Sequence, residues 1–206
     1  MKYYKPLKTV RGDFDYVKNV KFSPDGTSFA VSSNVPIIQI WDIALEKEVQ
    51  VLIGHLDAIN SIQFSPDGCM IVSCSSDKTI RLWDVKIAKQ VKILEGHSKA
   101  IISAQFSSDG NTIVSNSRDN TIRLWDVNSG KEVMQIETQL GLLSNVELSP
   151  DGEIIVGSSN TDDVVLWHVR THCKLITWHG HLSRIIQVQF SPDGRHVVSC
   201  SDDKLS

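Results

Sequence analysis

The chain has 206 residues, 41% of them hydrophobic and 22% charged, with a formal net charge of −3. This slightly acidic balance lacks the excess of Lys and Arg that binds phosphate, so we expect no nucleic-acid partner. No apolar run is long enough to cross a bilayer, and the first residues lack a signal-peptide pattern, so no membrane association is expected. What remains is an ordinary soluble composition in a chain long enough to bury a sizeable core.

Four short apolar runs alternate with turns in the second quarter of the chain, and each has the length and residue types of a β-strand. In chain order they are Ile59–Phe64, Met70–Cys74, Thr79–Asp84 and a weaker run, Gln90–Leu94. The third alternates polar and apolar residues with a period of two, which is typical of a half-buried strand. The first two are joined by Ser65-Pro-Asp-Gly68, in which Pro presets φ and Gly can take the positive φ of a tight turn. No window has helical spacing over a useful length, so we predict four consecutive antiparallel strands.

The same turn recurs five times, and each copy starts 42 residues after the one before. The copies start at Phe22, Phe64, Phe106, Leu148 and Phe190. A constant period of this length indicates one supersecondary unit repeated in space, each copy burying its apolar face against its neighbours. Small sheets repeated in this way predict a propeller. We therefore treat residues 1–206 as one domain with repeat units at about 12–53, 54–95, 96–137 and 138–179 and a partial unit at 180–206.

Two further sequence pairs carry a family resemblance. Gly54-His55 and Gly96-His97 precede the first strand, and Trp41-Asp42, Trp83-Asp84 and Trp125-Asp126 end the third. At constant spacing with the Ser-Pro-Asp-Gly turns, this set resembles the WD-repeat (WD40) β-propeller family over almost the whole chain. The resemblance implies an all-β propeller of four-stranded antiparallel blades, here about four complete blades plus partial terminal strands.

The repeat register at the two ends of the chain predicts an incomplete or open ring. Leu7–Val10 matches the fourth strand of a preceding blade, while Ile185–Phe190 and His196–Cys200 supply only the first two strands of the last blade. The next tryptophan would fall just beyond Ser206. A seven-bladed ring at this period would take roughly 290 residues. We expect an open arc that leaves strand edges and apolar blade faces uncovered.

Histidine, serine and aspartate recur together in the repeats, and this trio can activate a hydroxyl nucleophile in a hydrolase. The resemblance implies a structural role instead, in which Asp bonds His, His bonds a serine hydroxyl, and the hydroxyl bonds the indole N–H of Trp. Such a network satisfies polar groups inside a blade, and an enzyme needs one site rather than one in blade after blade, so no enzyme is predicted. Ser73 and Ser75 lie on the same strand face, and the sequence leaves the choice between them open. The network residues are expected to be His55, Ser73, Asp77 and Trp83; His97, Ser115, Asp119 and Trp125; and His181, Ser199 and Asp203.

Two repeat units depart from this pattern in pairs. In the first unit Asp13 stands in place of the histidine and Val35 in place of the turn aspartate; in the fourth unit Gln139 and Thr161 stand there. Losing donor and acceptor together avoids leaving one of them buried without a partner. We therefore predict that blades one and four are locally softer than blades two and three.

His172, Cys173, His179 and His181 lie close together in sequence and suggest a set of metal ligands. The register places the first two before the predicted fourth strand and the last two after it. A five-residue strand separates the two pairs by roughly 15 Å, whereas zinc ligands each lie about 2 Å from the ion. We therefore expect no metal and no cofactor. The four cysteines show no disulfide spacing, which favours the reducing cytoplasm or, alternatively, the nucleus.

The resemblance implies a non-catalytic scaffold that binds peptide or protein partners and takes no small-molecule substrate. By analogy with the family, the residues five positions after the Gly-His histidine line the central opening, namely Lys18, Asn60, Ile102, Ser144 and Ile186. Ordinary variation at a strand edge explains these residues equally well. Arg81 and Arg123 are interpreted as solvated charges on the outer face of the third strand. The alternative function is a sensor or regulatory propeller belonging to a larger multidomain signalling protein.

Overall fold

The computed structural model describes residues 16–138, 143–159 and 162–203, which form strands and turns. None of these residues belongs to a helix, so no helix in the described part of the chain could span a bilayer. The first two sheets consist of β1 (Val17–Phe22), β2 (Ser28–Ser33), β3 (Ile37–Asp42) and β4 (Lys47–Ile53), then β5 (Ile59–Phe64), β6 (Met70–Ser75), β7 (Thr79–Asp84) and β8 (Lys89–Glu95). The next two consist of β9 (Ile101–Phe106), β10 (Thr112–Ser117), β11 (Thr121–Asp126) and β12 (Glu132–Glu137), then β13 (Leu143–Leu148), β14 (Ile154–Ser159), β15 (Asp163–His168) and β16 (Lys174–His179). A last sheet has two strands, β17 (Ile185–Phe190) and β18 (Val197–Ser201).

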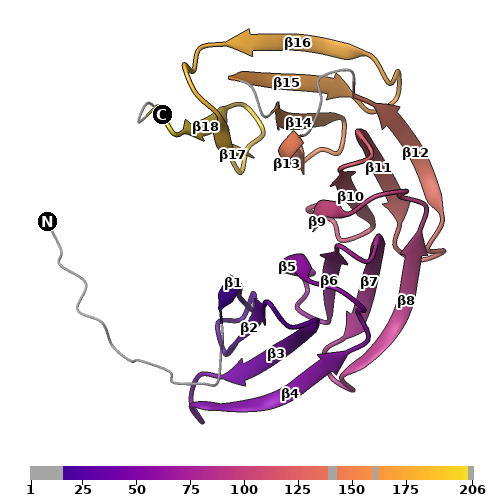
Figure 1. Ribbon diagram of the computed structural model, residues 1–206, viewed down its shortest axis with the longest axis vertical. Helices are drawn as coiled ribbons and strands as arrows, with labels where there is room; N and C mark the ends of the chain where they lie inside the picture. Colours follow the sequence, from indigo (N-terminus) through magenta and orange to yellow (C-terminus); the bar gives the residue numbers. More distant parts are fainter. Residues whose placement is uncertain (1–15, 139–142, 160–161, 204–206) are drawn as a thin grey trace, which may run out of the picture.

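Each four-stranded sheet is an antiparallel meander in which neighbouring strands follow each other along the chain. Figure 1 shows the sheets arranged side by side as blades of an arc, with the first strand of each blade toward the centre and the fourth on the outside. The all-β propeller architecture predicted from the repeat is therefore confirmed. The predicted bounds of β5 and β7 agree with the structure, while β6 and β8 extend one residue further than predicted at one or both ends.

The recurrent turn closes the hairpin between the first two strands of each blade, and it does so with its own side chains. In the second blade Oγ of Ser65 donates to Asp67 and accepts from the backbone N–H of Met70 over 2.9 Å. The backbone N–H of Gly68 donates to the carbonyl oxygen of Ser65 over 2.9 Å, with φ at 72°. This left-handed φ is strained for a residue with a Cβ, which explains the glycine at this position of every turn.

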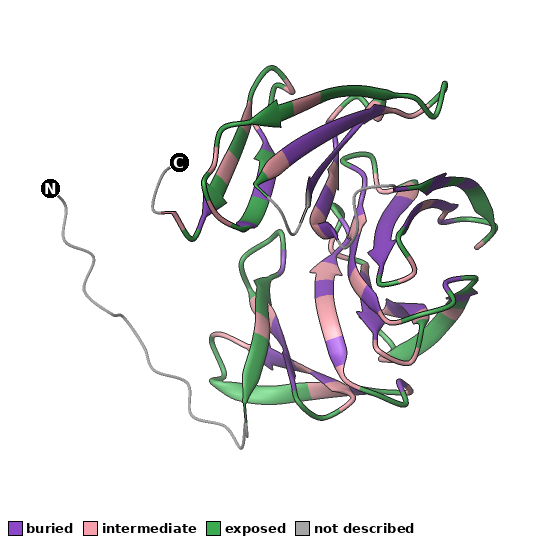
Figure 2. Ribbon diagram, turned by 45° about the horizontal axis from the view of Figure 1, so that its top comes forward, coloured by how far each residue is buried: buried purple, intermediate pink, exposed green. Residues whose placement is uncertain are grey.

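The hydrophobic core lies between the sheets and not inside any one of them. Ile38 and Ile40 of β3 face the second blade, where they meet Ile62, Phe64 and Trp83 in one buried cluster. Equivalent clusters join the second blade to the third, the third to the fourth, and the fourth to β17 and β18. Figure 2 shows the consequence: buried residues concentrate on the inner and middle strands, while the outermost strands are largely exposed. Each blade therefore depends on its neighbours for stability.

The arc is open, and its two end faces are uncovered. Phe22 of β1 is 67% exposed, whereas Phe64, one period later, is 6% exposed because the first blade covers it. At the other end Val198 of β18 is 57% exposed, while its counterpart Val156 is fully buried. Within the described residues no sheet joins the two ends, so the predicted incomplete ring is confirmed. The segment Leu7–Val10, which the register assigns to a further strand, lies outside the described residues.

Candidate functional site

In the second blade, four side chains from four different segments meet in one chain of hydrogen bonds. Nδ1 of His55 lies 2.7 Å from Oδ2 of Asp77, and its Nε2 lies 2.8 Å from Oγ of Ser73. The indole N–H of Trp83 donates to the same Ser73 oxygen over 2.8 Å. His55 precedes β5, Ser73 lies on β6, Asp77 in the β6–β7 turn, and Trp83 on β7. This series of hydrogen bonds therefore links the loop that precedes the blade to the two middle strands of the blade.

The chemistry of the donors fixes the direction of this chain and distinguishes the two candidate serines. An indole N–H only donates and an ionised carboxylate only accepts, so in the neutral imidazole Nδ1–H of His55 donates to Asp77 and Nε2 accepts from Ser73. Oγ of Ser75 instead accepts from the backbone N–H of Asp77 and donates to the carbonyl oxygen of Asp57 over 2.9 Å. Ser73 is thus the serine of the network, and Ser75 supports the turn that presents Asp77.

The third blade repeats the same geometry, with His97 joined to Asp119 and Ser115, and Trp125 to Ser115, each over 2.9 Å. Burial acts to raise the pKa of Asp119, but hydrogen bonds from Thr121 and His97 outweigh it and lower that pKa to about 2. Burial is also the main influence on His97, and it lowers the histidine pKa against the opposing effect of Asp119. At neutral pH the pair is therefore a neutral imidazole donating to a carboxylate.

The last, two-stranded sheet holds the same three polar residues without an indole donor among the described residues. Nδ1 of His181 lies 3.0 Å from Oδ2 of Asp203, and its Nε2 lies 2.8 Å from Oγ of Ser199. The histidine side chain is 11% exposed, compared with 0% for His55 and His97. The polar part of the network therefore assembles here in a half-covered blade.

The four residues first considered as metal ligands are not brought together. His172 lies in the turn before β16, with a positive φ of 58°, and Cys173 is exposed beside it. His179 ends β16 and pairs with Asp163 of β15, while His181 belongs to the network just described. Among the described residues no group of three or more His, Cys, Asp or Glu side chains could hold a metal ion.

The two arginines interpreted as solvated are mostly buried, so that interpretation was wrong. The side chains of Arg81 and Arg123 are 11% and 12% exposed, and each guanidinium bonds the fourth strand, at Gln90 and Glu132 respectively. Arg81 is two residues from Trp83 and therefore on the same face of β7, the face covered by the Gly-His loop.

The glycine of each Gly-His pair provides room for those side chains. A Cβ placed on Gly96 would lie 2.6 Å from Nη1 of Arg123 and 3.0 Å from Cη2 of Trp125, and Gly54 is confined in the same way. Such distances are shorter than van der Waals contact, and the indole is held by the network. The glycine is therefore required by close approach and not by a positive φ.

The five residues predicted to line the central opening share one structural position. In every inner strand the pairing with the second strand slips by one residue at this point, as between Ile59 and Ser61 or between Val17 and Asn19. The extra residue of each slip is Lys18, Asn60, Ile102, Ser144 or Ile186. A β-bulge of this kind re-aims the side chain of the extra residue.

The environments of these bulge residues differ from blade to blade. Lys18 and Ile186 are exposed, and the other three are half-buried. Asn60 reaches the next blade, since its Nδ2 donates to the carbonyl oxygen of Ile101 over 2.7 Å. The backbone pairing at the bulge is thus the same in every inner strand, while the side chain at the bulge position varies among the blades.

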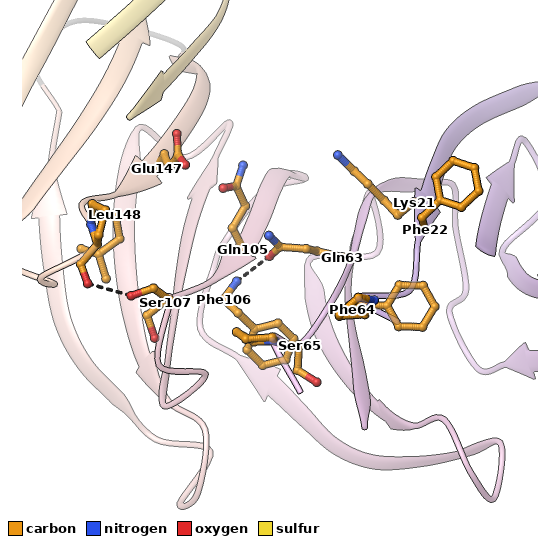
Figure 3. A pocket seen from close by; sticks show the side chains of 14 residues that line it. Lys21, Phe22, Gln63, Phe64, Ser65, Gln105, Phe106, Ser107, Glu147 and Leu148 are labelled. Atoms are coloured by element: carbon orange, nitrogen blue, oxygen red, sulfur yellow. Dashed lines mark hydrogen bonds between the residues drawn. The ribbon is translucent and has the colours of Figure 1, made fainter. Parts of the chain in front are cut away.

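The other end of the inner strands surrounds a hollow of about 420 Å³ that the sequence analysis did not predict. Figure 3 shows Lys21, Gln63, Gln105 and Glu147 projecting around it from four successive inner strands. Oε1 of Gln63 accepts from the backbone N–H of Phe106 over 2.7 Å, which links two blades. The sequence contained a signal for this ring of polar side chains, because each of them lies one position before the first residue of a recurrent turn.

The comparison with protein families agrees with this geometry. The family model of the WD domain, G-beta repeat, matches residues 4–42, 46–84, 88–126 and 172–205, which together make up well over half of the chain. The chain belongs to the WD-repeat family. No curated protein matches it closely enough to count as a relative. WD repeats generally mediate protein–protein interactions, and their proteins are typically non-enzymatic scaffolds.

Blades one and four have lost the serine of the network as well as the residues noted in the sequence. Val31 and Gly157 stand one period before Ser73 and one period after Ser115. A Cβ on Gly157 would lie 2.9 Å from Cζ3 of Trp167, so the indole occupies the space of the missing side chain. A comparison of Ser73 with the residues at the same position of the other repeats, 42 residues apart, would have predicted this loss.

The remaining departures are only partly visible in the structure. Val35 lies in the β2–β3 turn and is 40% exposed, where the equivalent Asp77 is mostly buried. Asp13, Gln139 and Thr161 lie outside the described residues. At the positions that the structure describes, blades one and four have lost polar members of the network but keep the tryptophan, as Trp41 and Trp167.

Proposed function

We propose that this WD-repeat protein is a non-catalytic scaffold that binds peptide or protein partners across the starts of its inner strands. The observation that carries the proposal is the bulge repeated in all five inner strands, which places side chains of four different types at one equivalent strand position. A rigid frame with variable residues at fixed points is the physical requirement of a recognition surface. Two of these residues, Lys18 and Ile186, are exposed and available to a partner.

Two observations support the absence of catalysis. Ser73 and Ser115, the only network hydroxyls that share an indole donor among the described residues, are both 0% exposed. A nucleophile must meet its substrate, and these oxygens already accept one hydrogen bond and are enclosed by the blade. The arrangement also occurs in more than one blade, as expected of a structural device.

The experiment is affinity capture from the native cell with three baits, followed by mass spectrometry. The baits are the wild-type chain, a bulge variant carrying Lys18→Ala, Ile102→Ala and Ile186→Ala, and a control carrying Val49→Ala and Val91→Ala on the exposed outer strands. We expect at least one partner to be retained by the wild type and the control and lost by the bulge variant. Partners that bind all three baits equally would contradict the proposed surface.

We further propose a cytoplasmic location. All four cysteines are free thiols, including Cys69, Cys173 and Cys200, which are exposed. Burial raises the pKa of the fully buried Cys74 far above its usual range, which keeps that thiol unreactive. Exposed unpaired thiols suit a reducing compartment. Imaging of the tagged protein in its own cell tests this location, and secretion into the medium would contradict it.

A further inference from the structure

The contact between blades three and four differs from the other contacts at the recurrent turns. Pro24, Pro66 and Pro150 each lie against the turn glycine of the following blade, with ring carbons 3.3–3.4 Å from where a Cβ would stand. The third turn has Ser108 in place of proline. The turn glycine of the following blade, Gly152, has no other residue within 4 Å of the place where its Cβ would stand. Ser108 instead donates its hydroxyl hydrogen bond to the carbonyl oxygen of Pro150 over 2.7 Å, so the turns are still linked but the apolar contact at the glycine is missing.

A second reduction in volume occurs at the same contact. The residue that begins the recurrent turn is Phe64, Phe106 or Phe190 where the contacts are filled, but it is Leu148 in the fourth blade. Protein interiors are close-packed, so two smaller side chains at one contact leave a void unless something else fills it.

The structure contains a hollow of about 250 Å³ at this place, which we call the blade 3–4 hollow. Its apolar lining comes from Leu124, Val133, Leu148, Pro150 and Val169. Val133 is 60% exposed, so the apolar surface continues outward onto β12. An apolar cavity of roughly 150 Å³ already holds a benzene-sized group, so there is room here for an aliphatic side chain.

The lining of the blade 3–4 hollow is negatively charged. Asp109 and Asp151 lie in its lining, and hydrogen bonds from the hydroxyls of Ser107 and Ser149 are the main cause of their lowered pKa values. Both carboxylates are therefore ionised at neutral pH. No Lys or Arg is among the described residues that line the hollow. A cationic group from outside would complement this charge.

We propose that the blade 3–4 hollow receives an aliphatic side chain of a partner peptide, with a Lys or Arg next to it in that peptide placed against Asp109 and Asp151. The proposal rests on the proposed scaffold function and names a second contact surface and the chemistry of its partner. The apolar anchor supplies the affinity, and the charge pair selects the flanking residue.

The test is selection of a phage-displayed random peptide library on the wild-type chain, followed by affinity measurements on three variants. Ser108→Pro fills the hollow with the residue that the other four turns carry, so the backbone accepts it. Leu148→Phe fills it from the opposite wall with the residue of the other units. Val49→Ala with Val91→Ala, on the exposed outer strands, is the matched control.

We expect enriched peptides to carry Leu, Ile or Val beside Lys or Arg. Their affinity should fall about tenfold or more in Ser108→Pro and Leu148→Phe, stay unchanged in the control, and weaken as salt is raised. Melting curves verify that both filled variants fold. Peptides bound equally by the wild type and the two filled variants would overturn this inference while leaving the proposed function standing. Failure to enrich any peptide would overturn this inference, and the capture experiment would then decide the scaffold function separately.

Discussion

Blades two and three contain the buried hydrogen-bond network, whereas blades one and four form the same four-stranded sheet without its serine. The register is also the same in all four blades: β3 and β4 slip by one residue at Trp41, and the equivalent strand pairs slip at Trp83, Trp125 and Trp167. The network therefore does not set the register. We infer that strand patterning, the recurrent turn and the apolar contacts between blades determine the shape, and that the network adds local stability.

The largest difference between the two kinds of blade should appear when the histidine is removed. His97→Ala leaves Ser115 and the carboxylate of Asp119 without their central partner and opens a cavity beside Trp125. We expect a loss of about 3 kcal/mol in the free energy of unfolding, measured by urea denaturation. Gln139→Ala, at the same repeat position in the fourth blade, should cost less than about 0.5 kcal/mol. Equal losses would contradict the view that blade three depends on a network that blade four lacks.

The second prediction tests the close approach at the Gly-His pair. Gly96→Ala forces a methyl group against Arg123 and Trp125, so we expect a loss of about 2 kcal/mol. Gly180→Ala is the matched control, because it has the same repeat position and a Cβ there would have nothing within 4 Å. Its effect should be within about 0.5 kcal/mol. Comparable losses at both glycines would show that backbone freedom, and not the packed indole, explains the residue.

The sequence predicted the repeat and the strands because these follow from local rules, whereas the network members came from the family resemblance. Period-two alternation and turn chemistry are properties of neighbouring residues, and constant spacing converts them into a three-dimensional register. The burial of Arg81 and the bulge at Asn60 were missed because each depends on what another segment covers. The blade 3–4 hollow arises from side chains 40 residues apart, such as Ser108 and Leu148, whose volumes become comparable only when the contacting faces are known.

The third prediction concerns pH. Because the pKa of folded His97 lies below its ordinary 6.5, the unfolded chain binds more protons than the folded chain below that pH, so stability should fall as pH drops below about 6.5. A further fall is expected between about pH 3.8 and 2, where the unfolded state protonates Asp119 first. Denaturation of the wild type and of His97→Gln across this range tests the first step. The difference between the two curves should shrink as the pH falls from 7 to 5; a constant difference would contradict it.

The smallest effect is expected from restoring one network residue to a blade that lacks the others. Val35→Asp places a carboxylate in the β2–β3 turn, at the position of Asp77, but the chain has Asp13 where the histidine would stand and Val31 where the serine would stand. The new carboxylate gains only local turn hydrogen bonds and loses a partly exposed apolar side chain, so stability should change by less than about 0.5 kcal/mol. Hydrogen exchange of β2 and β3 provides the local measurement. Marked slowing of exchange there would mean that the aspartate stabilises a blade alone, and the network would then be a sum of independent bonds instead of a unit.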